Sequence, residues 1–281
     1  MEWTPGGVSQ DVEDQRGSGG FRMGGLGGPH IGIGGALVLI VLSLIFHRNF
    51  FAIFTGTPVE PARVMRPETR GDQDREIQFV SFVLDDVQHT WDSLLPQQAR
   101  RPYRHAKLVV FRDYIESGCG EAQSATGPFY CPSDEKVYID LGFYQELSRR
   151  FGAPGEFAEA YVIAHEIGHH VQKLLGIEAA VHRAQMRDPS AQNHLSVGLE
   201  LQADCLAGVW GHSTEQRSII DQADVQDGLR AAAAVGDDRI QKMQQGKVSP
   251  ESFTHGSSAQ RVAAFRSGLE AGNLSACLSS Q

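Results

Sequence analysis

Basic residues are scarce in this 281-residue chain, with 25 Lys and Arg against 34 Asp and Glu, so its net charge is −9. No stripe of basic residues interleaved with aromatic ones occurs along it, although such a stripe is the usual footprint of a nucleic-acid interface. An internal repeat at the period of a solenoid is also missing. We therefore expect neither a nucleic-acid partner nor a repeat array.

Cysteine is rare as well, and none of the four cysteines forms a Cys-x-x-Cys pair of the kind that binds zinc. Cys119 and Cys131 bracket a short loop with Gly and Pro, and Cys205 and Cys277 are the remaining two. An even number in such positions predicts the disulfides Cys119–Cys131 and Cys205–Cys277 in an oxidising compartment. Four free, buried thiols are the alternative.

One long run without charge extends from Ile31 to Phe46, and further apolar residues follow up to Phe54. The run is somewhat short for a hydrocarbon layer of about 30 Å. We interpret residues 31–54 as one transmembrane helix with an interfacial segment; a cleaved signal peptide and a buried core helix are the alternatives. The Lys and Arg residues on either side do not decide the orientation.

The composition divides the rest of the chain. Residues 1–30 are Gly-rich and polar and predict a disordered tail. Residues 55–75, rich in Pro, Arg and acidic residues, predict a linker. Residues 76–281 then form one domain, long enough for a sizeable core.

The most informative motif is His165-Glu166-Ile-Gly-His169. The surrounding residues 156–175 predict an amphipathic helix that ends at Gly176. Side chains four residues apart lie on the same helix face, so the two imidazoles can share one Zn²⁺ while Glu166 acts as a general base.

A zinc hydrolase site needs a third protein ligand and leaves the fourth position for water. Glu200 and Asp204 stand within an apolar helical segment, residues 195–210, where a buried carboxylate is costly unless paired or bound to metal. We expect Glu200 to be the third ligand and Asp204 to accept the outer N–H of a ligand imidazole. A solvated acidic edge is the alternative.

Together, His-Glu-x-x-His and Glu-x-x-Ala-Asp resemble the gluzincins, the zinc peptidases to which thermolysin belongs. The wider sequence is similar to one bacterial membrane family, the neutral zinc metallopeptidases. The matching pieces are Asp11–Gly17, Ser117–Gly120, Gly127–Pro132, Lys136–Leu141, Ala164–Gln172, Leu199–Cys205 and Phe253–Arg261. The resemblance implies a single-pass protein of the bacterial inner membrane with an extracytoplasmic peptidase domain. It also implies a mainly helical α+β, zincin-like fold with a small sheet, acting on a peptide or protein substrate.

Zinc peptidases of this style pair the substrate backbone with an edge strand beside the active-site helix. The β-type run Val137, Tyr138, Ile139 and Asp140 is our candidate for that strand, and a strand inside a small sheet is the alternative.

Three later or neighbouring residues also attract attention. Gluzincins use a histidine or tyrosine late in the chain to stabilise the oxyanion, and His255 is our candidate, with capping and packing as the alternative. Arg261 could pair with a carboxylate of the site. His170 is turned away from the metal by the helix step and is expected to have a supporting or packing role.

The sequence therefore predicts a membrane-anchored zinc peptidase with one Zn²⁺ per chain, held by His165, His169 and Glu200. The alternative is a catalytically silent zinc-binding module of the cell envelope, acting as a chaperone or assembly factor. The intact Glu166 argues against it, since a purely structural site has no use for a general base.

Overall fold

The computed structural model describes residues 1–17, 70–123 and 127–278. Among these, no helix is long and apolar enough to cross a membrane. The predicted transmembrane run, residues 31–54, lies outside the described part of the chain. The end of the predicted linker, from residue 70, already belongs to helix α3 (Arg70–Ala99).

A four-stranded sheet forms one layer of the domain, in the order β1 (Val12–Asp14), β2 (Lys107–Phe111), β6 (Lys136–Asp140), β5 (Phe129–Cys131). The first three strands run parallel, and β5 runs antiparallel to β6. Among the described strands, β1 and β5 are the two edges of this sheet. A second, two-stranded sheet is the hairpin of β3 (Tyr114–Ser117) and β4 (Gly120–Gln123).

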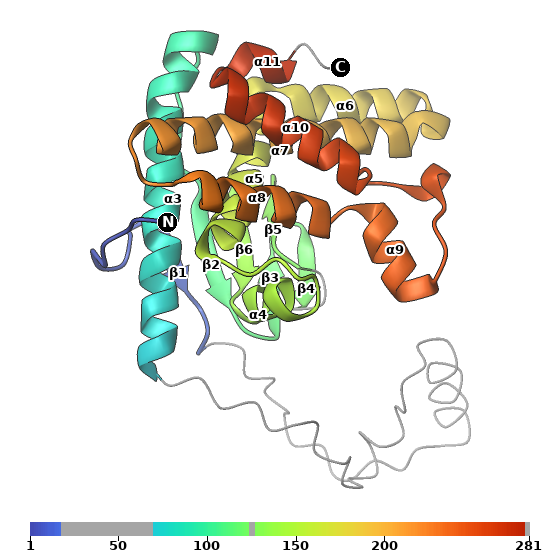
Figure 1. Cartoon of the computed structure of the whole chain (residues 1–281). Coiled ribbons are helices and arrows are strands. Elements are labelled where there is room, and N and C mark those ends of the chain that lie inside the picture. The colour runs from blue at the N-terminus through green and yellow to red at the C-terminus, as the bar shows by residue number, and fades with distance from the viewer. Residues whose placement is uncertain (18–69, 124–126, 279–281) are drawn as a thin grey trace, which may run out of the picture. The chain divides into compact units, whose positions relative to one another are not determined.

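Alternation along β2 and β6 gives the sheet two apolar faces, because successive side chains of a strand point to opposite sides. Leu108 and Ile139 belong to the main core, together with residues of the helices. Val109 and Tyr138 face the other way, into a smaller core with Ile115 of the hairpin. Both faces are therefore covered, one by helices and the other by β3 and β4 (Figure 1).

Helices account for most of the remaining chain, as expected for a mainly helical α+β domain (Figure 1). They are α4 (Gly142–Arg149), α5 (Glu156–Leu175), α6 (Ile177–Arg187), α7 (Gln192–Gln216), α8 (Gln222–Ala234), α9 (Asp237–Gln245), α10 (Ser258–Ala271) and α11 (Leu274–Leu278), with short 3₁₀ turns at Pro189–Ala191 and Pro250–Ser252. The predicted end of α5 is confirmed: Gly176 adopts a left-handed conformation with φ of 78° and terminates the helix.

Helix α5 lies very close to α7 at Gly168. A Cβ atom built on Gly168 would lie 2.9 Å from the carbonyl oxygen of Ala203 and 3.1 Å from its Cα. Ala203 thus packs against α5, as its small size suggests. Gly208 of α7 allows a close contact with α10 instead, because a Cβ there would meet the Phe265 carbonyl oxygen at 2.1 Å.

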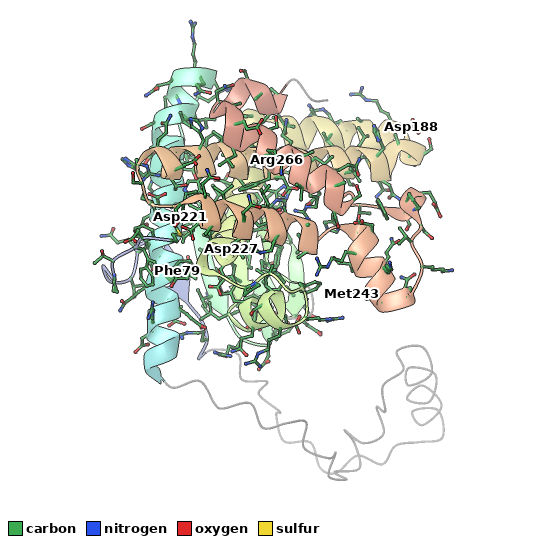
Figure 2. All side chains as sticks on the ribbon, in the orientation of Figure 1. Phe79, Asp188, Asp221, Asp227, Met243 and Arg266 are labelled. Carbon is green, nitrogen blue, oxygen red and sulfur yellow. A yellow bond between two sulfur atoms is a disulfide. The ribbon has the colours of Figure 1, made fainter. Side chains whose placement is uncertain are left out.

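The prediction that residues 1–30 form a disordered tail is wrong for residues 1–17, the part that the structure describes. The ammonium group of Met1 lies 2.7 Å from a carboxylate oxygen of Asp224. The ring of Trp3 packs edge-on at 5.3 Å against Phe79, whose position on α3 is labelled in Figure 2. The strand β1 then pairs with β2. Low hydrophobicity predicted disorder, but main-chain hydrogen bonds to a sheet edge need little apolar surface.

The pairing of β1 with β2 also constrains topology. Hydrogen-bonded strands must lie in the same compartment, so residues 12–14 and 107–111 lie on the same side of any membrane. A chain that crossed a bilayer once between them would separate the two strands. The predicted crossing at residues 31–54 lies outside the described residues and stays a prediction, which the pairing of β1 with β2 makes testable.

We expect Val8→Cys and Met243→Cys, whose native side chains are 59% and 43% exposed, to react alike with a membrane-impermeant maleimide in intact cells and in spheroplasts. Labelling one position from outside and the other only after lysis would demonstrate a single crossing and contradict the strand pairing.

Gly168→Ala should destabilise the domain by about 1–3 kcal/mol, because the new methyl group meets the backbone of α7 rather than a side chain that can move. Denaturant unfolding measures the change. Gly198→Ala is the matched control: it lies within α7, a Cβ there meets nothing within 4 Å, and the variant should be as stable as the wild type or more stable. Equal stability of all three proteins would show that the contact between α5 and α7 does not require a glycine at position 168.

Candidate metal centre

Helices α5 and α7 bring His165, His169 and Glu200 together. The Nε2 atoms of the two imidazoles lie 3.2 Å apart. One carboxylate oxygen of Glu200 lies 3.2 Å from Nε2 of His165, and the other lies 3.5 Å from Nε2 of His169. Each residue offers one ligand atom, and the three atoms lie within 4.8 Å of one another.

These spacings fit a tetrahedral zinc ion. With metal–ligand bonds of about 2.0–2.1 Å, ligand atoms at tetrahedral angles lie about 3.3 Å apart. Two imidazoles and one carboxylate form a donor set that zinc accepts, and three protein ligands leave one position for water. In the described part of the chain, this is the one cluster of at least three His, Cys, Asp or Glu residues that could hold a metal ion.

Asp204, fully buried, orients the first imidazole. Its Oδ1 lies 2.9 Å from Nδ1 of His165, so the ring donates from Nδ1 and directs Nε2 toward the cluster. The same oxygen accepts a hydrogen bond from the hydroxyl of Tyr161, one helical turn earlier on α5. Tyr161 was not predicted, although its position four residues before His165 places it on the same helix face.

Arg261 neutralises the buried carboxylate. Its Nε lies 2.8 Å from Oδ2 of Asp204 and one terminal nitrogen lies 3.0 Å from Oδ1, a bidentate pair between α10 and α7. Burial alone would raise the pKa of Asp204, but Arg261 and His165 lower it. Burial alone would likewise lower the pKa of His165, whereas Asp204 and Glu200 raise it to about 10.

Gln172 does for the second imidazole what Asp204 does for the first. Its Oε1 lies 2.9 Å from Nδ1 of His169, and its side-chain nitrogen donates to the carbonyl of Leu199 at 2.7 Å. This residue was missed in the sequence, although it follows His169 by three positions, which is one turn of the same helix.

Glu166 lies beside the cluster and lines the same cavity, of about 520 Å³. The side chain is buried, with 7% of its surface exposed. No hydrogen-bond partner for its carboxylate occurs among the described residues. A base in this state is available to a water molecule in the cavity.

His255 also lines the cavity, from the loop before α10. Asp237, at the start of α9, lies 3.2 Å from Nδ1 of His255 and accepts its backbone N–H at 2.7 Å. The hydrogen bond to Asp237 raises the pKa of His255. Sequence reasoning missed Asp237, because no short spacing connects it with His255.

The predicted edge strand is wrong. Residues Val137, Tyr138, Ile139 and Asp140 form β6, which is buried between β2 and β5. The strand that lines the cavity is β5, together with Gly127 and Pro128 just before it. We chose this run because it is the last β-type run before the helix with His165, but burial on both faces is typical of an internal strand.

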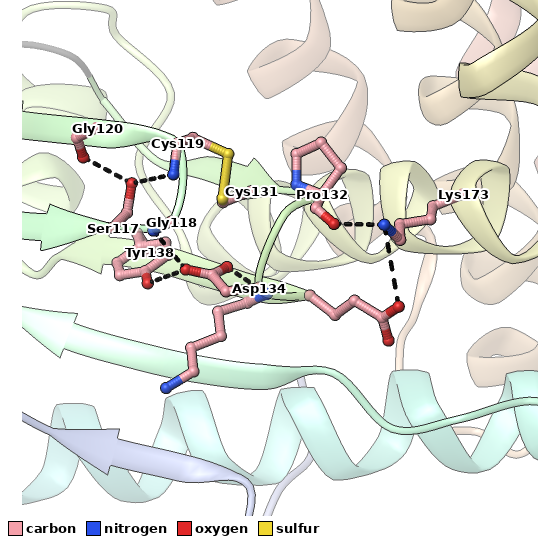
Figure 3. The surroundings of a disulfide bond; sticks show 11 residues. Ser117, Gly118, Cys119, Gly120, Cys131, Pro132, Asp134, Tyr138 and Lys173 are labelled. Carbon is pink, nitrogen blue, oxygen red and sulfur yellow. Dashed lines mark hydrogen bonds and ion pairs between the residues drawn. A yellow bond between two sulfur atoms is a disulfide. The ribbon is translucent and has the colours of Figure 1, made fainter.

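Several contacts hold β5 in place. The Cys119–Cys131 disulfide joins its last residue to the β3–β4 turn (Figure 3), and Lys173 of α5 donates to the carbonyl of the following Pro132. Tyr130 of β5 donates its hydroxyl to Nδ1 of His170 at 2.9 Å.

His170 therefore supports the strand rather than the metal cluster. Its Nε2 lies 2.6 Å from the carbonyl oxygen of Arg104, which can only accept, so the ring donates there and accepts from Tyr130 at Nδ1. The imidazole is fully buried, and burial lowers its pKa.

The second disulfide, Cys205–Cys277, joins α7 to α11. Its cysteine on α7 lies one residue after Asp204, so this bridge anchors the C-terminal end of the described chain beside the metal cluster.

Comparison with known proteins gives a family match over residues 1–280, to the family described as "Putative neutral zinc metallopeptidase". The uncharacterized protein YpfJ of Escherichia coli K12 is 43% identical over 282 residues, covering 99% of this chain and 98% of that protein. The uncharacterized protein Rv2575 of Mycobacterium tuberculosis H37Rv is 42% identical over 221 residues, covering 74% of this chain and 72% of that protein. No solved structure matches the chain.

We expect one zinc ion per chain, with Glu200→Ala losing most of the affinity because it removes one of three ligands. Asp204→Ala should weaken binding by about 10- to 100-fold, as the loss of a partner that orients a ligand does. Competition with a chromophoric chelator measures both, and Glu215→Ala, farther along α7, is the control. Unchanged affinity in Glu200→Ala would rule that residue out as a ligand.

Proposed function

We propose that this chain, which belongs to the putative neutral zinc metallopeptidase family, hydrolyses peptide bonds at the His165, His169 and Glu200 cluster. The observation that carries this proposal is the position of Glu166, whose carboxylate lines the same cavity as the cluster and has no partner among the described residues. A purely structural metal site would need neither the cavity nor the free carboxylate.

A bound zinc ion would polarise the scissile carbonyl and lower the pKa of a water molecule toward 7. Glu166 accepts the proton of the attacking water and delivers it to the leaving amine. Asp204 and Gln172 hold the two imidazoles in place through their Nδ1 atoms. Because these hydrogen bonds form without substrate, the two imidazoles are already positioned when the substrate binds.

His255 is the proposed donor to the oxyanion. Asp237 occupies the neighbourhood of its Nδ1, which leaves Nε2 as the nitrogen available to the cavity. The raised pKa keeps the ring protonated, and therefore able to donate, to higher pH than an ordinary histidine.

The substrate backbone would pair with β5. This strand has one neighbour, β6, among the described strands, so the main-chain groups along its other edge are available to an extended peptide. Its contacts to α5 and to the hairpin make β5 a fixed template, which reduces the entropy lost on binding.

Part of the cavity lining is apolar. Phe143, Val162, Val235 and Ile240 line it from α4, α5 and the region of α8 and α9. Such a surface gains free energy by burying a large aliphatic or aromatic side chain. We therefore propose a substrate with a large apolar residue near the scissile bond.

The two disulfides support a location outside the cytoplasm, because cytoplasmic thiols are kept reduced. Because β1 pairs with β2, the N-terminal residues would lie on the same side. Membrane association through residues 31–54 stays a prediction from the sequence.

Glu166→Gln should keep the fold and the zinc ion but lose hydrolysis by about 10²- to 10⁴-fold, because an amide cannot accept the proton. Mass spectrometry of a peptide library incubated with each protein measures cleavage, and it also reports the residues beside the cut. If wild type and variant leave the library equally intact, the catalytically silent zinc-binding envelope module becomes the better account.

Asp237→Asn should shift the alkaline limb of kcat/KM to lower pH. The Asp237 carboxylate raises the pKa of His255. Without it the ring loses its proton at a lower pH and can then no longer donate the hydrogen bond to the oxyanion. His255→Gln, which removes the ring, should lower kcat by about 10²- to 10³-fold. A pH profile unchanged in Asp237→Asn would assign the pair to loop packing alone.

A further inference from the structure

His169 can bind a metal through Nε2 only if that nitrogen carries no proton. The neutral ring has one N–H, and the hydrogen bond made by the other nitrogen decides where it sits. In His169, Nε2 faces the cluster and Nδ1 faces Gln172 at 2.9 Å. The state of this ligand therefore depends on which atom the Gln172 amide presents to it.

Two acceptors fix the orientation of that amide. The side-chain nitrogen of Gln172 donates to the carbonyl of Leu199 at 2.7 Å and to Oε1 of Gln202 at 3.0 Å. A backbone carbonyl cannot donate, so the NH₂ group must face it. The remaining atom, Oε1, then faces His169 and can only accept.

The orientation of Gln202 is fixed in the same way. Its nitrogen donates to the carbonyl of Cys277 at 3.0 Å, which turns its Oε1 toward Gln172. Gln172 and Gln202 are 1% and 4% exposed, so water does not compete for these groups. Cys277 is held against α7 by its disulfide to Cys205, three residues after Gln202.

We infer that the carbonyl groups of Leu199 and Cys277 determine, through Gln202 and Gln172, that His169 carries its proton on Nδ1 and presents a bare Nε2. Gln172 and Gln202 are thus positioning residues, and the Cys205–Cys277 disulfide holds one end of the chain of hydrogen bonds. The inference rests on the proposed role of His169 as a metal ligand, but it concerns the protein before metal binds.

The two imidazoles would then be oriented by different means. His165 is oriented by a carboxylate that Arg261 neutralises, whereas His169 is oriented by neutral amides. The amides add no charge to the cluster, so the ligand set keeps only the charge of Glu200.

The test uses the full chain without metal, with ¹⁵N-labelled histidine, at a pH where the spectra show a neutral His169 ring. Long-range ¹H–¹⁵N spectra show which nitrogen of His169 carries the proton, and chelator competition gives the zinc Kd. Gln172→Met leaves only a weak thioether acceptor, so it should lose the single Nδ1–H form and weaken zinc binding about 10-fold. Gln172→Glu keeps an acceptor and should keep the proton on Nδ1.

A single Nδ1–H form with wild-type Kd in Gln172→Met would overturn the inference. Absence of zinc binding by the wild type would instead count against the proposed metal site, since the tautomer is read without metal. The two outcomes are therefore distinguishable.

The disulfides provide a second, matched test that does not depend on Gln172→Met folding. Cys205→Ser/Cys277→Ser should broaden or shift the His169 signals and weaken zinc binding, because the carbonyl of residue 277 is no longer held against α7. Cys119→Ser/Cys131→Ser removes the other bridge and should leave both the tautomer and the Kd unchanged. Equal effects of the two double variants would contradict a specific role for the Cys277 carbonyl.

Discussion

The buried carboxylate of Asp204 is the interaction on which the site depends. It receives hydrogen bonds from Tyr161 and His165 of α5 and from Arg261 of α10. A charge in this position is tolerated only because it is paired, and removing one partner of such a pair costs about 3–5 kcal/mol. The contacts that stabilise the packing of these three helices therefore also orient the imidazole of His165, a proposed metal ligand.

The cavity is bounded by a pair of helices on one side and by an edge strand on the other. On one side, α5 and α7 meet at Gly168 and Ala203, which brings Glu200 within reach of the imidazoles. On the other side, β5 is tied to α5 by Tyr130 and to the hairpin by a disulfide. At the opposite edge of the sheet, β1 pairs with β2. The edge strand that lines the cavity is β5.

Local patterns in the sequence were sufficient for helix α5 and for part of the site. The i, i+4 histidines and the end of α5 at Gly176 depend on neighbouring residues alone. Local patterns did not identify the edge strand, because β5 and β6 both contain apolar and aromatic residues. Only their neighbours in the sheet distinguish them. The first 17 residues were misjudged for the same reason: their order comes from a sheet edge and from Phe79, far along the chain.

By itself, the sequence determined that one helix would present two imidazoles and a carboxylate on one face, because helical periodicity is a property of consecutive residues. Only the tertiary structure decided what surrounds them. The pairing of Arg261 with a carboxylate was predicted and is confirmed, but Gln202 and Asp237 acquire their roles only because folding brings them to partners 30 and 18 residues away. Spacing along the chain carries no record of such contacts, since they arise from the shape of the packed core.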